Sequence, residues 1–127
     1  MKSEDFLNPY KKEKDIIEGK LKLLKVYLFS DDDYNLLASS LLSFFTTNDF
    51  PKLPRKIMFK KLDRKYVGWV LKEIWQCFKT EKFDKRIIEF AVHNINRFEG
   101  CKIPKGKLFG TNIYKAFTTK PKSYKYR

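Results

Sequence analysis

The chain has few of the residues on which disulfide frameworks, metal centres and loop-rich folds depend. Its 127 residues include two cysteines, one histidine, five glycines and five prolines. Two cysteines do not make a disulfide framework, and one histidine excludes a metal centre built from several of them. So little glycine and proline argues against a loop-rich β-sandwich. We therefore expect neither a metal nor a cofactor.

A long apolar run is also missing. A helix that spans a bilayer needs roughly 20 apolar residues, and no run in this chain approaches that length. The first residues, 1–5, are polar and acidic, and no apolar secretory segment follows them. The sequence therefore predicts a cytoplasmic protein with no membrane partner.

Acidic residues are absent from the last part of the chain. Residues 1–50 carry seven Lys and nine Asp or Glu, residues 51–99 carry thirteen basic and six acidic side chains, and residues 100–127 carry eight Lys or Arg and no acid. The whole net charge of +13 thus lies after residue 50. Summed like charge attracts a polyanion or an acidic protein face, so this pattern favours a binding protein over an enzyme.

Core-forming residues are plentiful, at 43% hydrophobic and 17% aromatic, which excludes a disordered basic tail as the whole protein. Apolar periodicity predicts helices over 15–29, 34–46, 63–79, 84–100 and 112–117. We expect a mainly α fold, a single-domain bundle of four to five helices over residues 1–119. A basic linker and a basic aromatic tail, 120–127, complete it. A strand over 20–29 is the alternative there, because that segment half-alternates.

Several positions are predicted from the caps and faces of these helices. Ser30 and Asp31–Asp33 offer an N-cap and charges that favour a helix N-terminus. Ser40 falls on the polar side of the second helix, and Cys77 falls on the apolar arc of the third. Gly100 is the expected end of the fourth helix.

The linker over residues 51–65 is the first candidate binding surface. It carries seven basic residues and one acid, and Ile57, Met58 and Phe59 interrupt it. Its basic residues are Lys52, Arg55, Lys56, Lys60, Lys61, Arg64 and Lys65. The alternative is a solvated connection whose apolar trio plugs into the core.

The C-terminal tail is the second candidate, because it alternates cations with aromatic side chains. Phosphates attract Lys and Arg, and unstacked bases attract aromatic faces. The tail residues are Lys120, Lys122, Tyr124, Lys125, Tyr126 and Arg127, and the acid-free stretch extends back through Lys102, Lys105, Lys107 and Lys115. The alternative is a frayed terminus without contacts.

Trp69 falls on the polar side of the third predicted helix, where it is anomalous. It is either a stacking platform or partner contact, or a side chain that the linker or tail covers, and we favour the second.

The polar face of the predicted helix 84–100 offers a secondary site. Its basic and amide side chains are of the kinds that read base edges, although Glu89 at the centre would repel phosphate. They are Lys85, Arg86, His93, Asn96 and Arg97. This face supports an alternative function, a DNA-binding transcriptional regulator of a mobile element.

Two of these residues carry a resemblance. Arg86 and His93 are separated by six residues, a spacing that resembles the Arg-(4 to 6 residues)-His signature of the HEPN ribonucleases. The resemblance implies a helical ribonuclease that pairs two such motifs across a dimer. Ile87 stands where that family commonly has a polar residue.

In size and composition the chain resembles the small, basic, Lys-, Phe- and Ile-rich proteins of phages and mobile elements, among them anti-CRISPR proteins. The resemblance implies an inhibitor in the bacterial host cell, with a type VI RNA-targeting CRISPR effector and its guide RNA as the expected target. We therefore expect a non-enzymatic protein that binds RNA or a ribonucleoprotein through its cationic surface, with no catalytic residue.

Overall fold

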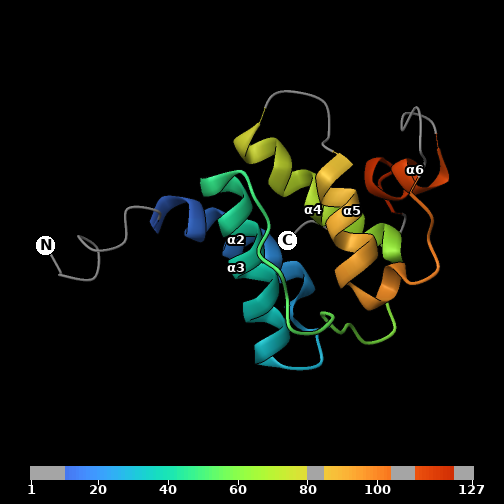
Figure 1. Cartoon of the computed structure of the whole chain (residues 1–127), viewed down its shortest axis with the longest axis horizontal. Helices are drawn as coiled ribbons and strands as arrows, with labels where there is room; N and C mark the ends of the chain where they lie inside the picture. The colour runs from blue at the N-terminus through green and yellow to red at the C-terminus, as the bar shows by residue number, and fades with distance from the viewer. Residues whose placement is uncertain (1–10, 80–84, 104–110, 122–127) are drawn as a thin grey trace, which may run out of the picture.

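Five α-helices and one 3-10 helix carry the fold, as described by a computed structural model for residues 11–79, 85–103 and 111–121 (Figure 1). They are α2 (Lys11–Lys25), α3 (Asp31–Thr47), α4 (Arg64–Phe78), α5 (Lys85–Asn94), η1 (Asn96–Phe98) and α6 (Asn112–Thr118). Helix α2 packs on α3 and α4, and α4 packs on α6. The predicted mainly helical, single-domain bundle is confirmed.

Helix α2 forms because its apolar residues recur at helical spacing. Ile17, Leu21 and Leu24 make one buried stripe. The helix ends at Lys25, so the alternative strand over 20–29 is wrong for its first part. Leu28 alone pairs in an extended way, through one antiparallel bridge to Phe59.

Helix α3 begins at Asp31, three residues earlier than predicted, and Ser30 is its N-cap as expected. The Ser30 hydroxyl accepts a hydrogen bond from the Asp33 amide at 3.2 Å. The expectation that Ser40 lies on the solvated side is wrong, because this residue is buried. Its hydroxyl donates to the Leu36 carbonyl at 2.6 Å, so the helix itself satisfies the buried group.

Helix α4 begins after the N-cap Asp63, whose carboxylate accepts from the Lys65 amide at 2.9 Å. Cys77 is exposed, so its predicted place in the core is wrong. The last turn of α4 packs through Trp75 and Phe78 against Phe45, with ring centroids 6.1 and 4.4 Å apart. This contact turns Cys77 to the solvent side.

A glycine sets the distance between α4 and α6. A Cβ atom added at Gly68 would lie 2.6 Å from the Ala116 carbonyl oxygen and 3.1 Å from the Phe117 Cα. Both are backbone atoms, which cannot rotate away as a side chain can. Only glycine therefore permits the observed crossing, which buries Ala116 and Phe117.

Helix α5 ends at Asn94, so the prediction that it continues to Gly100 is wrong. Ile95 is extended, with φ −119° and ψ 126°, and forms a parallel bridge with Ile57. The Ile57 amide donates to the Asn94 carbonyl at 2.7 Å, and the Asn96 amide donates to the Ile57 carbonyl at 3.1 Å. Pairing with a distant segment thus overrides the local helical pattern.

The part of the linker that makes these pairings is an extended segment, residues 55–60. Its two inward side chains, Ile57 and Phe59, belong to the core, and Met58 between them points outward. The Asn96 side chain pairs with Phe59 like a neighbouring strand, accepting from its amide at 2.8 Å and donating to its carbonyl at 2.9 Å. The core insertion considered for the apolar trio is confirmed for two of its three residues.

Candidate nucleic-acid interface

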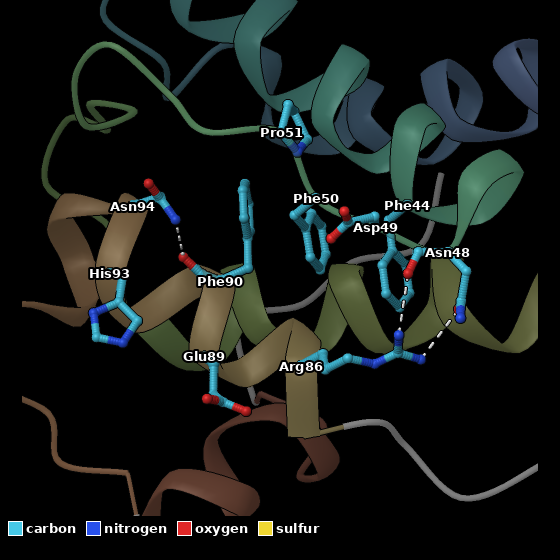
Figure 2. A pocket seen from close by; sticks show the side chains of 10 residues that line it. All are labelled: Phe44, Asn48, Asp49, Phe50, Pro51, Arg86, Glu89, Phe90, His93 and Asn94. Carbon is cyan, nitrogen blue, oxygen red and sulfur yellow. Dashed lines mark hydrogen bonds between the residues drawn. The ribbon is translucent and has the colours of Figure 1, made fainter.

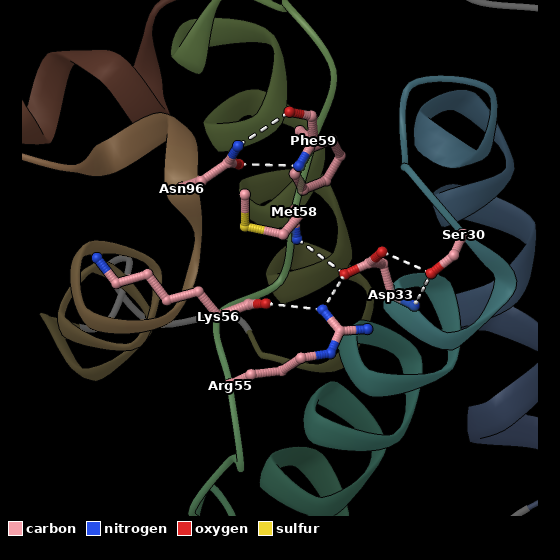
Figure 3. Close-up of polar contacts among 7 residues, drawn as sticks. All are labelled: Ser30, Asp33, Arg55, Lys56, Met58, Phe59 and Asn96. Carbon is pink, nitrogen blue, oxygen red and sulfur yellow. Dashed lines mark hydrogen bonds and ion pairs between the residues drawn. The ribbon is translucent and has the colours of Figure 1, made fainter.

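The extended segment is anchored by one buried carboxylate, Asp33 at the start of α3 (Figure 3). Asp33 is 2% exposed and accepts hydrogen bonds from the Ser30 hydroxyl at 2.6 Å and the Met58 amide at 2.9 Å. Arg55 Nη1 lies 2.6 Å from Oδ1, the same oxygen that accepts from the Met58 amide, while Ser30 donates to Oδ2. Asp33 therefore holds the linker against α3 and fixes its register.

Two opposing effects act on the pKa of the Asp33 carboxyl. Burial raises this pKa because it penalises the charged form. The hydrogen bonds from Ser30, Met58 and Arg55, together with the charge of Arg55, lower it, and their sum keeps it below its ordinary value of 3.8. The carboxyl is therefore ionised at neutral pH and pairs with Arg55.

Alternation along the extended segment places its core side chains on one side and its charged side chains on the other. Lys56 and Lys60 are exposed on the same side as Met58, while Ile57 and Phe59 between them are buried. Lys56 pairs with Glu99 at 3.2 Å. Lys60 and the following Lys61 make no ion pair with any residue that the structure describes. These two cations are available to an external anion.

The end of the linker opens into a cationic hollow of about 650 Å³. Lys61, Arg64 and Arg97 line it, together with Leu62 and Asp63. Arg97 Nε donates to the Leu62 carbonyl at 2.6 Å, which fixes its guanidinium at the rim. The hollow thus gathers three cations against one carboxylate, and that carboxylate is the cap of α4.

A second hollow of about 370 Å³ adjoins the first through Arg64, which lines both. Lys102, Cys101 and Thr111 are among its other lining residues. Arg64 Nη1 lies 3.1 Å from the Cys101 sulfur. Together the two hollows make a continuous cationic surface from the linker to the N-terminus of α6, which we call the Arg64 surface. Its cations are Lys61, Arg64, Arg97 and Lys102.

Other predicted cations lie elsewhere or beyond the described residues. Lys52 and Lys65 are exposed but line neither hollow, and Lys115 and Lys120 are exposed on and after α6. Pro121 is buried, so the chain stays packed at the last described residue. The other candidates fall outside the described residues: Lys105, Lys107, Lys122, Tyr124, Lys125, Tyr126 and Arg127.

Trp69 is half-buried. It is therefore neither a fully exposed stacking platform nor a fully covered side chain, the two alternatives that the sequence left open. The Lys72 ammonium lies 3.5 Å from the centre of its ring, a cation–π contact. Burial lowers the pKa of Lys72, against a smaller opposing effect of Glu73. Within its own helix this tryptophan already has a cationic partner on its face.

The predicted recognition face of 84–100 is not one surface, because its helix ends at Asn94. Asn96 is turned to the Phe59 backbone, and Arg97 belongs to the Arg64 surface. Lys85 is half-buried, while Arg86 and His93 are exposed. The face that would enter a DNA groove is therefore divided.

Arg86 and His93 do line one cavity, of about 240 Å³, between α5 and the end of α3 (Figure 2). Arg86 donates to the Asn48 carbonyl at 3.1 Å and to its Oδ1 at 3.2 Å. Its guanidinium carbon also lies 4.9 Å from the centre of the Phe44 ring. Glu89 lines the same cavity and adds a carboxylate to the arginine and the imidazole.

Sequence reasoning named Asp33 only as a charge at a helix N-terminus and Asn96 only as part of a polar helix face, and it missed that both residues position the interface. Both act on the backbone of a segment far away in the chain, Asp33 at Met58 and Asn96 at Phe59. The available signal was the short apolar run Ile57 to Phe59 between lysines, which is compatible with a strand-like segment but does not identify its partners.

No protein-family model matches the chain, and neither a curated protein nor a solved structure was found to be similar to it. Among the described residues, no helix is both long and apolar enough to cross a membrane.

Proposed function

We propose that this protein binds RNA or a ribonucleoprotein through the Arg64 surface and acts without catalysis. By its resemblance in size and composition to anti-CRISPR proteins, we propose an inhibitor of an RNA-guided effector in a bacterial cell. The observation that carries the proposal is the convergence of Lys61, Arg64 and Arg97 on one hollow. Lys102 extends the same surface.

Electrostatics supports a polyanionic ligand. Each phosphate that a protein neutralises releases condensed counterions, so affinity depends steeply on salt. The cations of the Arg64 surface come from the linker, α4, η1 and the following turn, which the fold holds together. A surface assembled from separate elements presents its charges at fixed spacings. Arg97 loses little side-chain freedom when it binds a phosphate, because its Nε already donates to the Leu62 carbonyl.

The test is to replace Lys61 and Arg64 together by glutamine and to measure binding of a single-stranded RNA at several salt concentrations. Each lost phosphate contact should reduce the slope of log K against log salt by about 0.7. Affinity at low salt should fall by about tenfold or more, since a hydrogen bond to a charged group contributes roughly 1.5–3 kcal/mol.

A matched control replaces Lys12 and Lys14, exposed cations of α2, by glutamine. This control changes the net charge by the same amount, because it also replaces both of its cations, at a distant place in the sequence. Equal losses of affinity in the two double variants would mean that the charge acts without a defined surface, and the proposal would fail. Melting curves of both variants establish that the fold is retained.

The second candidate is a metal-independent ribonuclease, favoured by one observation. Arg86, His93 and Glu89 line the same cavity. In RNA cleavage a carboxylate can take the proton of the attacking 2′-hydroxyl, an imidazolium can protonate the leaving oxygen, and a guanidinium can bind the phosphate. The HEPN-like spacing of the arginine and the histidine agrees with this candidate.

Cleavage of a labelled RNA in the presence of a metal chelator separates the two candidates. If the cavity is catalytic, His93→Ala should reduce the rate by about a hundredfold or more while RNA affinity changes little. If the wild-type protein leaves the RNA intact, the ribonuclease is excluded and the binding function stands.

A further inference from the structure

Three large apolar side chains are exposed in the described residues, and two of them, Phe29 and Met58, lie on backbone segments that pair with each other. Val26 is 71% exposed, Phe29 59% and Met58 37%. Val26 and Phe29 belong to the connection between α2 and α3, and Met58 belongs to the extended segment. Single exposed apolar residues are ordinary on protein surfaces, whereas a cluster marks a contact site.

Backbone pairing brings Phe29 and Met58 together. The Phe29 amide donates to the Met58 carbonyl at 3.1 Å, beside the antiparallel bridge of Leu28 and Phe59. Because side chains alternate along paired strands, Leu28 and Phe59 point into the core, and Phe29 and Met58 beside them point outward. The exposed phenyl ring and thioether therefore share one outer face.

The same face carries Lys60, which makes no ion pair with any residue that the structure describes. The Lys60 amide donates to the Tyr27 carbonyl at 2.6 Å, which places Lys60 two positions after Met58 on the outer side of the segment. Lys61 follows it and lines the hollow of the Arg64 surface. The apolar cluster is thus joined through the chain to the cationic surface.

Two acidic side chains follow Phe29 closely in the chain. Asp31 and Asp32, at the first turn of α3, are exposed and directly follow Ser30. These carboxylates repel phosphates. We therefore expect a polyanion that reaches Phe29 to place its phosphates on Lys60 and Lys61 and not beside these carboxylates.

We propose that Phe29, supported by Met58, is a stacking platform for one unstacked base of a single-stranded RNA whose phosphates lie on Lys60, Lys61 and the Arg64 surface. The proposal rests on the proposed RNA-binding function and adds its selectivity. Every base offers a π-face to an aromatic ring, so such stacking needs no particular sequence. In a duplex the faces of the bases are hidden in the stack, so the platform favours single strands over duplexes.

The first test compares Phe29→Ala with the wild-type protein in binding to an oligouridylate and to an RNA duplex. Loss of the platform should weaken binding of the single strand by about fivefold or more, while duplex affinity and the salt slope stay unchanged. Phe29 is largely exposed, so the variant is expected to fold. Val26→Ala is the matched control, because it removes an exposed apolar group that has no ring from the same connection, and it should bind both RNAs like the wild type.

A second variant, Phe29→Trp, keeps an aromatic face and adds a fluorescent probe at the platform. Oligouridylate should quench the fluorescence of this variant more than that of the wild type, whose two tryptophans are Trp69 and Trp75. Affinity for the single strand should be equal to or higher than that of the wild type.

The failures of the two proposals are distinguishable. If the wild type binds oligouridylate and Phe29→Ala binds it equally well, the platform is overturned and the proposed function stands. If Val26→Ala loses as much affinity as Phe29→Ala, the contact is generally apolar and the stacking proposal is also overturned. If the wild type binds neither RNA, both proposals fall.

Discussion

Gly68→Ala should destabilise the protein by about 3 kcal/mol, because the added methyl group would collide with the backbone of α6. The new Cβ would lie 2.6 Å from the Ala116 carbonyl oxygen, closer than real contacts allow. Relief requires α6 to move away from α4, which uncovers Phe117. Denaturant-induced unfolding of the variant and the wild type measures the difference in the free energy of unfolding.

The matched control for this prediction is Gly19→Ala in α2. An added Cβ at Gly19 has no atom within 4 Å, and this residue is an exposed helical position. Alanine there should stabilise the protein by about 0.5–1 kcal/mol, since glycine costs helix stability. Equal stability of Gly68→Ala and the wild type would show that α6 does not pack on α4 at this distance.

Asp33→Asn should destabilise the protein by about 2–3 kcal/mol at neutral pH. The substitution keeps the size of the side chain but leaves Arg55 without its ion pair and replaces an acceptor that takes bonds from Ser30, Met58 and Arg55. The loss stays below that of a fully buried pair because the Arg55 side chain is 44% exposed. Chemical denaturation of both proteins gives the difference.

The same pair of proteins has a defined pH dependence. The pKa of Asp33 is lower in the folded protein than its ordinary value of 3.8, so its ionised form stabilises the fold. This stabilisation is fully present above the pKa of the unfolded chain and is lost as the pH falls through the lower folded pKa. The stability difference between wild type and Asp33→Asn should therefore be constant near neutral pH and shrink in acid.

Asp32→Asn is the control for the carboxylate. It makes the same chemical change one residue earlier in the first turn of α3, at an exposed side chain. Its effect should stay within about 0.5 kcal/mol, the range of a helix-dipole interaction at the surface. A loss as large as that of Asp33→Asn would mean that charge at the helix N-terminus, rather than the linker anchor, stabilises the protein.

The helices could be predicted from the sequence where local signals, such as N-caps and apolar spacing, decide the structure. Ser30, Asp63 and Thr111 each cap a helix, and these caps depend on residues only two or three positions away. The buried stripe of α2 follows from apolar spacing in the same way. Such features join residues within one or two helical turns of each other, so they can be recognised from the sequence.

Long-range pairing accounts for the errors. The pattern over 84–100 is helical throughout, yet the helix ends where Ile95 meets Ile57, thirty-eight positions earlier in the chain. The burial of Asp33 depends in the same way on Arg55 and Met58. No local rule reports which distant segment will lie alongside, so these features appear only in the folded molecule.

The candidate site was predicted by composition more than by geometry. Charge counting identified the linker cations, and the structure gathers Lys61 and Arg64 at one hollow with Arg97, which had been assigned to a different face. Phe29 was not singled out, because its exposure depends on pairing with Met58 rather than on its own helix.

The alternation in the extended segment has an evolutionary consequence. Ile57 and Phe59 serve the core, whereas Lys56, Met58 and Lys60 serve the surface, and the two sets occupy interleaved positions of the same short stretch. Substitutions at the outer positions leave the packing of the inner ones intact. Selection by a changing partner can therefore substitute the outward residues one at a time. Ile57 and Phe59 meanwhile keep the register of the segment the same in each variant.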